Sequence, residues 1–139
     1  MIQISARVQN SHENHLVTLR TDQEIHSLQI APKPDGTGSS VNGGELLFLA
    51  LATCYCNDIY REAAKLGIKV ESVEVDVQGD FGEAGSPAKN ITYRARVAAR
   101  ATEDQIRELM KLTDRVAEIH NTVRISAPVP LSSIEVVSL

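Results

Sequence analysis

An unusually apolar helical segment is the feature that most constrains how this chain of 139 residues can fold. Residues 46–56 read LLFLALATCYC, and this run is apolar on every side when it is drawn as a helix. The run is about half as long as a membrane-spanning helix, so we expect it to be buried in protein, with no membrane partner. One sheet and one other helix can hardly cover such a helix within so short a chain. The sequence therefore predicts an obligate homodimer.

Period-two and capping patterns predict the elements before and within this helix. Alternation of apolar and polar residues favours three N-terminal strands, over residues 2–9, 15–21 and 24–31. A loop rich in Gly, Pro and Ser follows over residues 32–44. Asn42 and Glu45 have the spacing of a capping box, which predicts the helix start, and Gly67 is suited to the position just past its end.

The second half of the chain predicts two further strands, a helix and a last strand. Alternating valines indicate a strand over 68–79 with a bulge near Glu71, and 90–99 supplies its hairpin partner. A second capping box starts a helix whose apolar spacing runs over 102–120, and 126–139 contain a proline-interrupted last strand. The order β-β-β-α-β-β-α-β predicts an α+β fold with a largely antiparallel sheet, in a single domain of residues 1–139.

Charge and residue types exclude several classes of partner. The net charge is -4, with acidic and basic residues intermingled, so no continuous basic stretch could bind nucleic acid. The N-terminal residues alternate rather than form the apolar core of a signal peptide, which favours a cytoplasmic, reducing location with both cysteines as thiols. His12 and His15 lie in a polar turn, so we predict no metal site there and no cofactor.

The two cysteines of the chain, Cys54 and Cys56, lie in the middle of the apolar helix. Residues two apart on a helix point about 200° away from each other, so these thiols cannot form a disulfide within an intact helix. Cys54 shares its stripe with Asp58, which disfavours a thiolate, and with Arg61, which can offset it. From the residues alone, a buried structural role is favoured for either cysteine.

A family resemblance changes this interpretation. Residues 38–80, GSSVNGGELLFLALATCYCNDIYREAAKLGIKVESVEVDVQGD, resemble the core of the OsmC/Ohr family, whose members include thiol-dependent hydroperoxide reductases. The resemblance implies an OsmC-like fold with a buried central helix and an intertwined homodimer that has two active sites at its interface. It places Cys54 at the position of the peroxidatic thiol and implies a role in the oxidative stress response.

The sequence departs from the family pattern around this thiol. The second cysteine of the family corresponds to Asn121, and the assisting Glu of Ohr-type members corresponds to Gly44. Glu45 matches only the helix-start Glu of the broader family, and a capping role is favoured for it. Arg20 is the nearest candidate for the family's thiolate-binding Arg, although a solvated strand residue is favoured there. His120 is a further candidate for handling a proton, with a core or interface histidine as the alternative.

Two hypotheses for the function remain open. In the first, Cys54 reduces organic hydroperoxides, and an external thiol reduces the resulting sulfenic acid because no second cysteine of the family pattern is present. In the second, the protein is a non-catalytic OsmC-like protein that binds a small apolar ligand at the dimer interface, or has another role. The second hypothesis stays open because a fold by itself does not define an activity.

Overall fold

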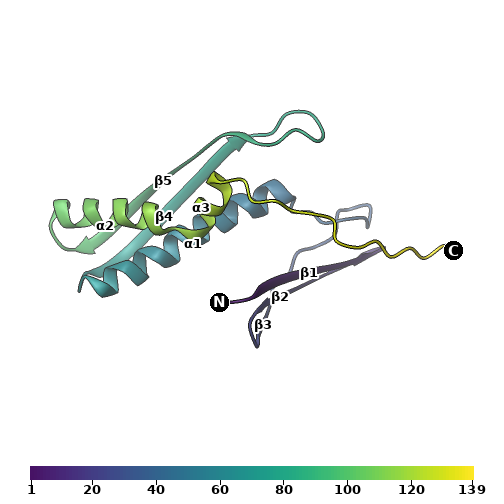
Figure 1. Ribbon diagram of the computed structural model, residues 1–139, viewed down its shortest axis with the longest axis horizontal. Helices are drawn as coiled ribbons and strands as arrows, with labels where there is room; N and C mark the ends of the chain where they lie inside the picture. The colour runs from purple at the N-terminus through teal and green to yellow at the C-terminus, as the bar shows by residue number, and fades with distance from the viewer. The chain divides into compact units, whose positions relative to one another are not determined.

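The computed structural model describes every residue of the chain, Met1–Leu139, as two compact units. Unit 1 is Met1–Leu47 and unit 2 is Phe48–Leu139, so the boundary lies inside the long first helix. No helix combines the length and the apolar character that crossing a membrane requires. The elements in chain order (Figure 1) are β1 (Ile4–Ser11), β2 (Asn14–Thr21), β3 (Glu24–Ser27), α1 (Gly43–Lys65), β4 (Lys69–Asp80), β5 (Lys89–Arg100), α2 (Glu103–Val116) and α3 (Glu118–Arg124).

Unit 1 is an antiparallel meander of β1, β2 and β3, which confirms the three predicted N-terminal strands. The turns between them use Glu13 and Asp22, both with positive φ, a conformation that acidic and amide residues in turns tolerate. The following loop is tied to the first turn, because the Glu13 N–H donates to the Gly36 carbonyl at 2.8 Å. Tight turns and this loop therefore fix the meander locally.

Helix α1 begins with the predicted capping box. The Glu45 N–H donates to Asn42 Oδ1 at 2.8 Å, and the Asn42 N–H donates to Glu45 Oε1 at 3.1 Å. These bonds satisfy backbone donors that the first turn of a helix leaves without partners. At the other end, Gly67 has φ +68°, the left-handed conformation expected just past the helix.

The core of unit 2 lies between the helices and one face of the β4–β5 hairpin. Tyr55, Ile59 and Ala63 from α1 and Leu109 from α2 are all buried. Alternate residues of both strands pack on them, which confirms the predicted period-two faces, and the register shifts between Val70 and Ser72, close to the predicted bulge. The residues packed around this core are Ile68, Val70, Val73, Val75, Tyr93, Ala95, Val97 and Met110.

Helix α1 is covered only in part by the other elements of unit 2. Ile59 is 0% exposed, whereas Leu49 and Tyr60, which lie about a quarter turn away from it around the helix, are 54% and 47% exposed. This agrees with the sequence argument that one hairpin and one further helix cannot cover an apolar helix on every side. The apolar character of α1 therefore exceeds what unit 2 buries.

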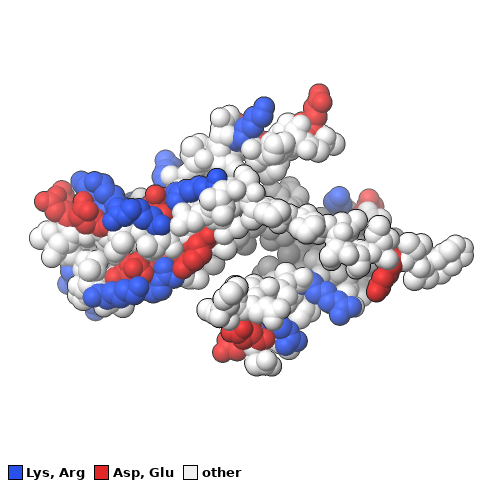
Figure 2. All heavy atoms as spheres, in the orientation of Figure 1, with Lys and Arg blue, Asp and Glu red and all other residues white.

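The outer face of the hairpin carries acidic residues on β4 and basic residues on β5. Glu71 pairs with Arg100, with 2.6 Å between Oε1 and Nε, and Asp76 pairs with Arg94 at 3.4 Å. Acidic and basic side chains are correspondingly interspersed over the end of unit 2 that carries α2 (Figure 2). Asp76 and Arg94 lie directly across the two strands, and such a pair of opposite charges favours this register over a slipped one.

The predicted helix over 102–120 is divided into two, which corrects the sequence prediction. Its capping box is present, but α2 ends at Val116 and Ala117 has extended backbone angles before α3 begins. The break is stabilised by side chains of α3, because Asn121 donates to the Arg115 carbonyl at 3.0 Å and Arg124 donates to the Asp114 carbonyl at 3.1 Å. These bonds satisfy carbonyls that the end of α2 leaves free.

The predicted last strand within residues 126–139 is absent, which is a second correction. Residues 127–139 form no regular element, and their apolar side chains are exposed, including Val136 at 82%. A strand needs a neighbouring edge to satisfy its backbone groups, and Pro128 and Pro130 also remove two N–H donors. The α+β class and the antiparallel pairing are confirmed, while the order of elements ends on α3 instead of a strand.

Candidate functional site

The two cysteines of α1 lie in different surroundings, as their angular separation predicts. Both are free thiols and both are partly buried. Cys56 lines a hollow of about 250 Å³ formed by α1 and β4, together with Ala52, Val73 and Val75. Cys54 faces α3 instead. The two sulfur atoms therefore contact different elements and have different chemical neighbours.

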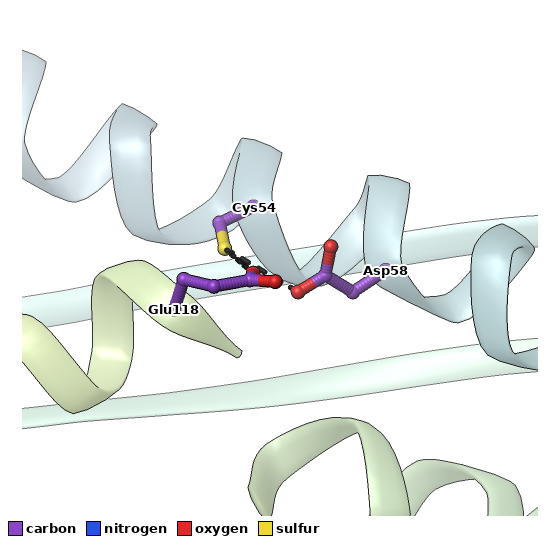
Figure 3. A group of neighbouring side chains, drawn as sticks. All are labelled: Cys54, Asp58 and Glu118. Carbon is purple, nitrogen blue, oxygen red and sulfur yellow. Dashed lines mark hydrogen bonds between the residues drawn. The ribbon is translucent and has the colours of Figure 1, made fainter. Parts of the chain in front are cut away.

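Cys54 contacts two carboxylates (Figure 3). Its Sγ lies 3.5 Å from Oδ2 of Asp58 and 3.8 Å from Oε2 of Glu118. Asp58 is one helical turn further along α1 and is buried, with 5% of its surface exposed. Glu118 is the first residue of α3, so the break after α2 brings it to the thiol. Elements far apart in the chain thus converge on one sulfur atom.

Arg61 connects the two carboxylates. Its Nη1 lies 3.1 Å from Oδ1 of Asp58 and 2.9 Å from Oε1 of Glu118, while its Nε lies 2.8 Å from Oε2 of Glu62. The ligand-type atoms of Cys54, Asp58 and Glu118 lie within 4.8 Å of one another, but Arg61 already supplies the positive charge that these carboxylates require. We call Cys54, Asp58, Arg61 and Glu118 the thiol cluster.

The thiol cluster favours a protonated thiol in the resting protein. Burial raises the pKa of the Cys54 thiol, and the negative charges of Asp58 and Glu118 raise it further, while a hydrogen bond from the backbone of Ile119 acts in the opposite direction. Burial also raises the pKa of the Asp58 carboxyl, as does its hydrogen bond with Glu118. The Glu118 pKa is lowered, first by its own backbone N–H and also by Arg61. The cluster therefore contains charged side chains such as Arg61 and Glu118, while the Cys54 thiol stays protonated.

The other residues named from the sequence lie apart from the hydrogen bonds of the thiol. Glu45 caps α1. Arg20 is exposed on β2, where it pairs in register with Ser5 and Ile25. Asn121, to which the resemblance assigns the position of the second cysteine, donates to the end of α2.

His120 lies in the core. It is 4% exposed, its ring lies 4.7 Å from that of Tyr93 and 6.1 Å from that of Tyr55, and neither ring nitrogen has a hydrogen-bond partner. Residues two apart on a helix face opposite ways, so α3 presents Glu118 to the thiol and His120 to the core. The sequence predicts Asp58 and Arg61 as neighbours of Cys54 but not Glu118, because a continuous helix over 102–120 gives no reason to single out this residue.

A family comparison covers the region that contains the thiol cluster. The profile described as OsmC-like protein matches residues 36–132, which is more than half of the chain. The chain belongs to the OsmC family. The thiol cluster of this OsmC-family protein lies wholly inside the matched region. No curated protein matches the sequence.

Solved structures similar to this OsmC-family protein share its fold at low sequence identity. An OsmC-like protein from Mycoplasma pneumoniae is 20% identical, with a TM-score of 0.61 over 89% of this chain and 87% of that one. An OsmC-like protein of unknown function from Vibrio cholerae is 20% identical, with a TM-score of 0.59 over 86% and 92%. An organic hydroperoxide resistance protein OsmC from Legionella pneumophila is 16% identical, with a TM-score of 0.50 over 88% and 89%. These similarities establish the OsmC-like fold.

Proposed function

We propose that this OsmC-family protein is a one-cysteine hydroperoxide reductase whose nucleophile is Cys54. The observation that carries the proposal is the position of Cys54 beside Asp58 and Glu118, two carboxylates held by Arg61, in the helix where the resemblance places the family's reactive thiol. Cys56 has no such partners and lines a largely apolar hollow. A thiol next to groups that can exchange protons is the arrangement expected of a nucleophile.

The proposed reaction uses one cysteine and an external thiol. The sulfur of Cys54 attacks one oxygen of a hydroperoxide R–O–O–H, the O–O bond breaks, and the products are a sulfenic acid at Cys54 and the alcohol R–OH. Sulfur loses two electrons and the peroxide gains them. An external thiol then forms a mixed disulfide with release of water, and a second external thiol attacks this disulfide, which restores the Cys54 thiol and releases the two external thiols joined as a disulfide. Asn121 stands where the family's second cysteine would be, which is why an external reductant is required.

The proposal includes a homodimer in a reducing, cytoplasmic setting. The exposed apolar side of α1, with Leu49 at 54% and Tyr60 at 47% exposed, supports a further protein surface over this helix. Both cysteines are free, as a reducing compartment requires. Sedimentation at micromolar concentration tests the assembly, and a monomer there would contradict it.

Trapping of sulfenic acid tests the chemistry. The reduced protein is treated with one equivalent of an organic hydroperoxide in the presence of a sulfenic-acid trap and analysed by intact mass, with Cys54→Ser and Cys56→Ser in parallel. We expect an adduct on the wild type and on Cys56→Ser but not on Cys54→Ser. If neither cysteine reacts faster than a free model thiol, the enzyme hypothesis is wrong. An adduct that survives Cys54→Ser but is lost in Cys56→Ser would make Cys56 the nucleophile.

A second candidate function is the binding of a small apolar ligand without catalysis. The raised pKa of the Cys54 thiol, caused by burial and by its two acidic neighbours, favours an unreactive cysteine. The hollow beside Cys56, with Val73 and Val75 in its wall, is suited to an apolar group. Binding of an apolar fluorescent dye that is weakened by Val75→Asp, in a protein whose thiols fail the peroxide test, would support this alternative.

A further inference from the structure

Each carboxylate of the thiol cluster offers one oxygen to Arg61 and the other to Cys54. In Asp58, Oδ1 contacts Arg61 at 3.1 Å and Oδ2 accepts from the thiol at 3.5 Å. In Glu118, Oε1 contacts Arg61 at 2.9 Å and Oε2 lies 3.8 Å from Sγ. Figure 3 shows the two carboxylates converging on the sulfur from different helices. The guanidinium therefore fixes both carboxylates while leaving one oxygen of each directed at the thiol.

This arrangement is unfavourable for storing a thiolate. A site built to keep a cysteine ionised places a cation or several N–H donors against the sulfur. Here the side chains in hydrogen-bond contact with Sγ are acidic, and the cation is on the far side of the carboxylates. Oxygens that disfavour a resting thiolate are nevertheless well placed to accept the proton of Cys54 during a reaction.

We propose that Asp58 and Glu118, held by Arg61, form a proton relay that takes the thiol proton of Cys54 and delivers it to the departing alkoxide. The inference rests on the proposed hydroperoxide reduction. The S–H bond breaks as the S–O bond forms, one carboxylate holds the proton, and the alkoxide RO⁻ released by O–O cleavage takes it as R–OH. No net charge accumulates, because the proton that leaves sulfur is the one that the alcohol gains.

The electrostatics of the pair are consistent with this role. Burial and the neighbouring Glu118 raise the pKa of Asp58, which makes its carboxylate a stronger base than an exposed aspartate. A stronger base is closer in proton affinity to the thiol and accepts its proton at a lower cost. Arg61 keeps both carboxylates in place while the proton is transferred.

Two reagents separate a relay from a simple electrostatic effect. Iodoacetamide alkylates a thiolate and releases iodide, which needs no proton, whereas cumene hydroperoxide releases an alkoxide that does. Asp58→Asn and Glu118→Gln each remove a negative charge beside the sulfur and so lower the thiol pKa. We expect alkylation of Cys54 at pH 7 to become roughly two- to tenfold faster in these variants. Their reaction with cumene hydroperoxide should become about tenfold or more slower.

The experiment is done on a Cys56→Ser background, with Glu108→Gln as the control. Glu108 is an exposed residue of α2 that pairs with Lys111, so its substitution changes the net charge equally without touching the thiol cluster. Neither rate should change in this control. Circular dichroism checks whether the buried Asp58→Asn variant folds. If it does not, Glu118→Gln alone tests the relay, because the Glu118 side chain is 61% exposed and its substitution should not affect folding.

The pH profiles provide a second readout. With the relay intact, the hydroperoxide rate should depend less steeply on pH than the alkylation rate, because the reacting form is the thiol with an ionised carboxylate. In Glu118→Gln both rates should follow the thiolate fraction. If both reagents instead react faster in both carboxylate variants, the relay is wrong and the carboxylates only oppose ionisation. If the wild type reacts with cumene hydroperoxide no faster than glutathione does, the proposed function itself fails.

Discussion

Helix α3 places two titratable side chains, two residues apart, in opposite surroundings. Glu118 lies in the thiol cluster, where one of its carboxylate oxygens contacts Arg61 and the other contacts Cys54, both from α1. His120 packs against Tyr93 and lies near Tyr55 in the core, where neither ring nitrogen has a partner. In the thiol cluster both oxygens of Asp58 and both oxygens of Glu118 therefore have a partner in Arg61 or Cys54. The buried histidine costs stability, because an unpaired polar group has been removed from water.

The largest change in the free energy of unfolding is expected from the core on which both the thiol cluster and the surroundings of His120 rest. Leu109 is 0% exposed and belongs to the buried cluster with Tyr55 and Ile59, so Leu109→Ala leaves a cavity beneath α1 and α2. We expect a loss of about 3 kcal/mol in the free energy of unfolding. Urea unfolding followed by circular dichroism measures it. A loss below about 1 kcal/mol would show that this core contributes little to the packing of α1 against α2 and would contradict the prediction.

Replacing the buried histidine should stabilise the protein. His120→Phe keeps an aromatic ring against Tyr93 and removes two unpaired polar atoms, which is expected to raise the free energy of unfolding by about 1 kcal/mol at pH 7. The same urea titration checks this change. A destabilised variant would mean that the imidazole gains more from its surroundings than its missing hydrogen bonds cost.

The same residue predicts how stability depends on pH. Burial lowers the pKa of His120, and Arg124 on α3 lowers it too, whereas Asp114 on α2 opposes them. The unfolded chain therefore binds a proton more readily than the folded chain. The stability contribution of the neutral ring is present above about pH 6.5, is lost as the pH falls below that value, and is fully lost below the lower folded-state pKa. The difference in stability between pH 7 and pH 5 should be smaller in His120→Phe than in the wild type.

The pKa of the Cys54 thiol reports on the electrostatics of the thiol cluster. Cys56→Ser leaves Cys54 as the single thiol, and burial with its acidic neighbours should place the midpoint of its alkylation by iodoacetamide above pH 9.0, the ordinary value of the thiol. Rates measured between pH 6 and pH 10 give this midpoint. A midpoint well below 9.0 would show that Arg61 or the Ile119 amide outweighs the carboxylates.

The smallest change in stability is expected at Glu118 itself. Its ion pair with Arg61 is largely exposed, with side chains 61% and 41% exposed, so Glu118→Gln should cost only about 0.5 kcal/mol. Unfolding at low and high salt measures this loss and should show that salt reduces it. A loss as large as that of Leu109→Ala would assign Glu118 to the framework of the fold rather than to the chemistry of the thiol.

Much of the fold could be predicted because its signals are local. The capping boxes at Asn42 and Thr102, the left-handed Gly67 and the alternating faces of β4 and β5 all depend on residues close together in the chain. The break at Ala117 could not be predicted in this way, because the apolar spacing continues through it. Only the side chains of α3, which return to the end of α2, show where the helix divides.

The sequence by itself determined the class of the fold, the separation of Cys54 from Cys56, and Asp58 and Arg61 as neighbours of the thiol. These follow from the regular geometry of one helix and from alternation along strands. Only the tertiary structure decided that Glu118 reaches a cysteine 64 residues earlier and that His120 faces the core. Such contacts depend on how separate elements pack, and no local pattern in the sequence encodes that packing.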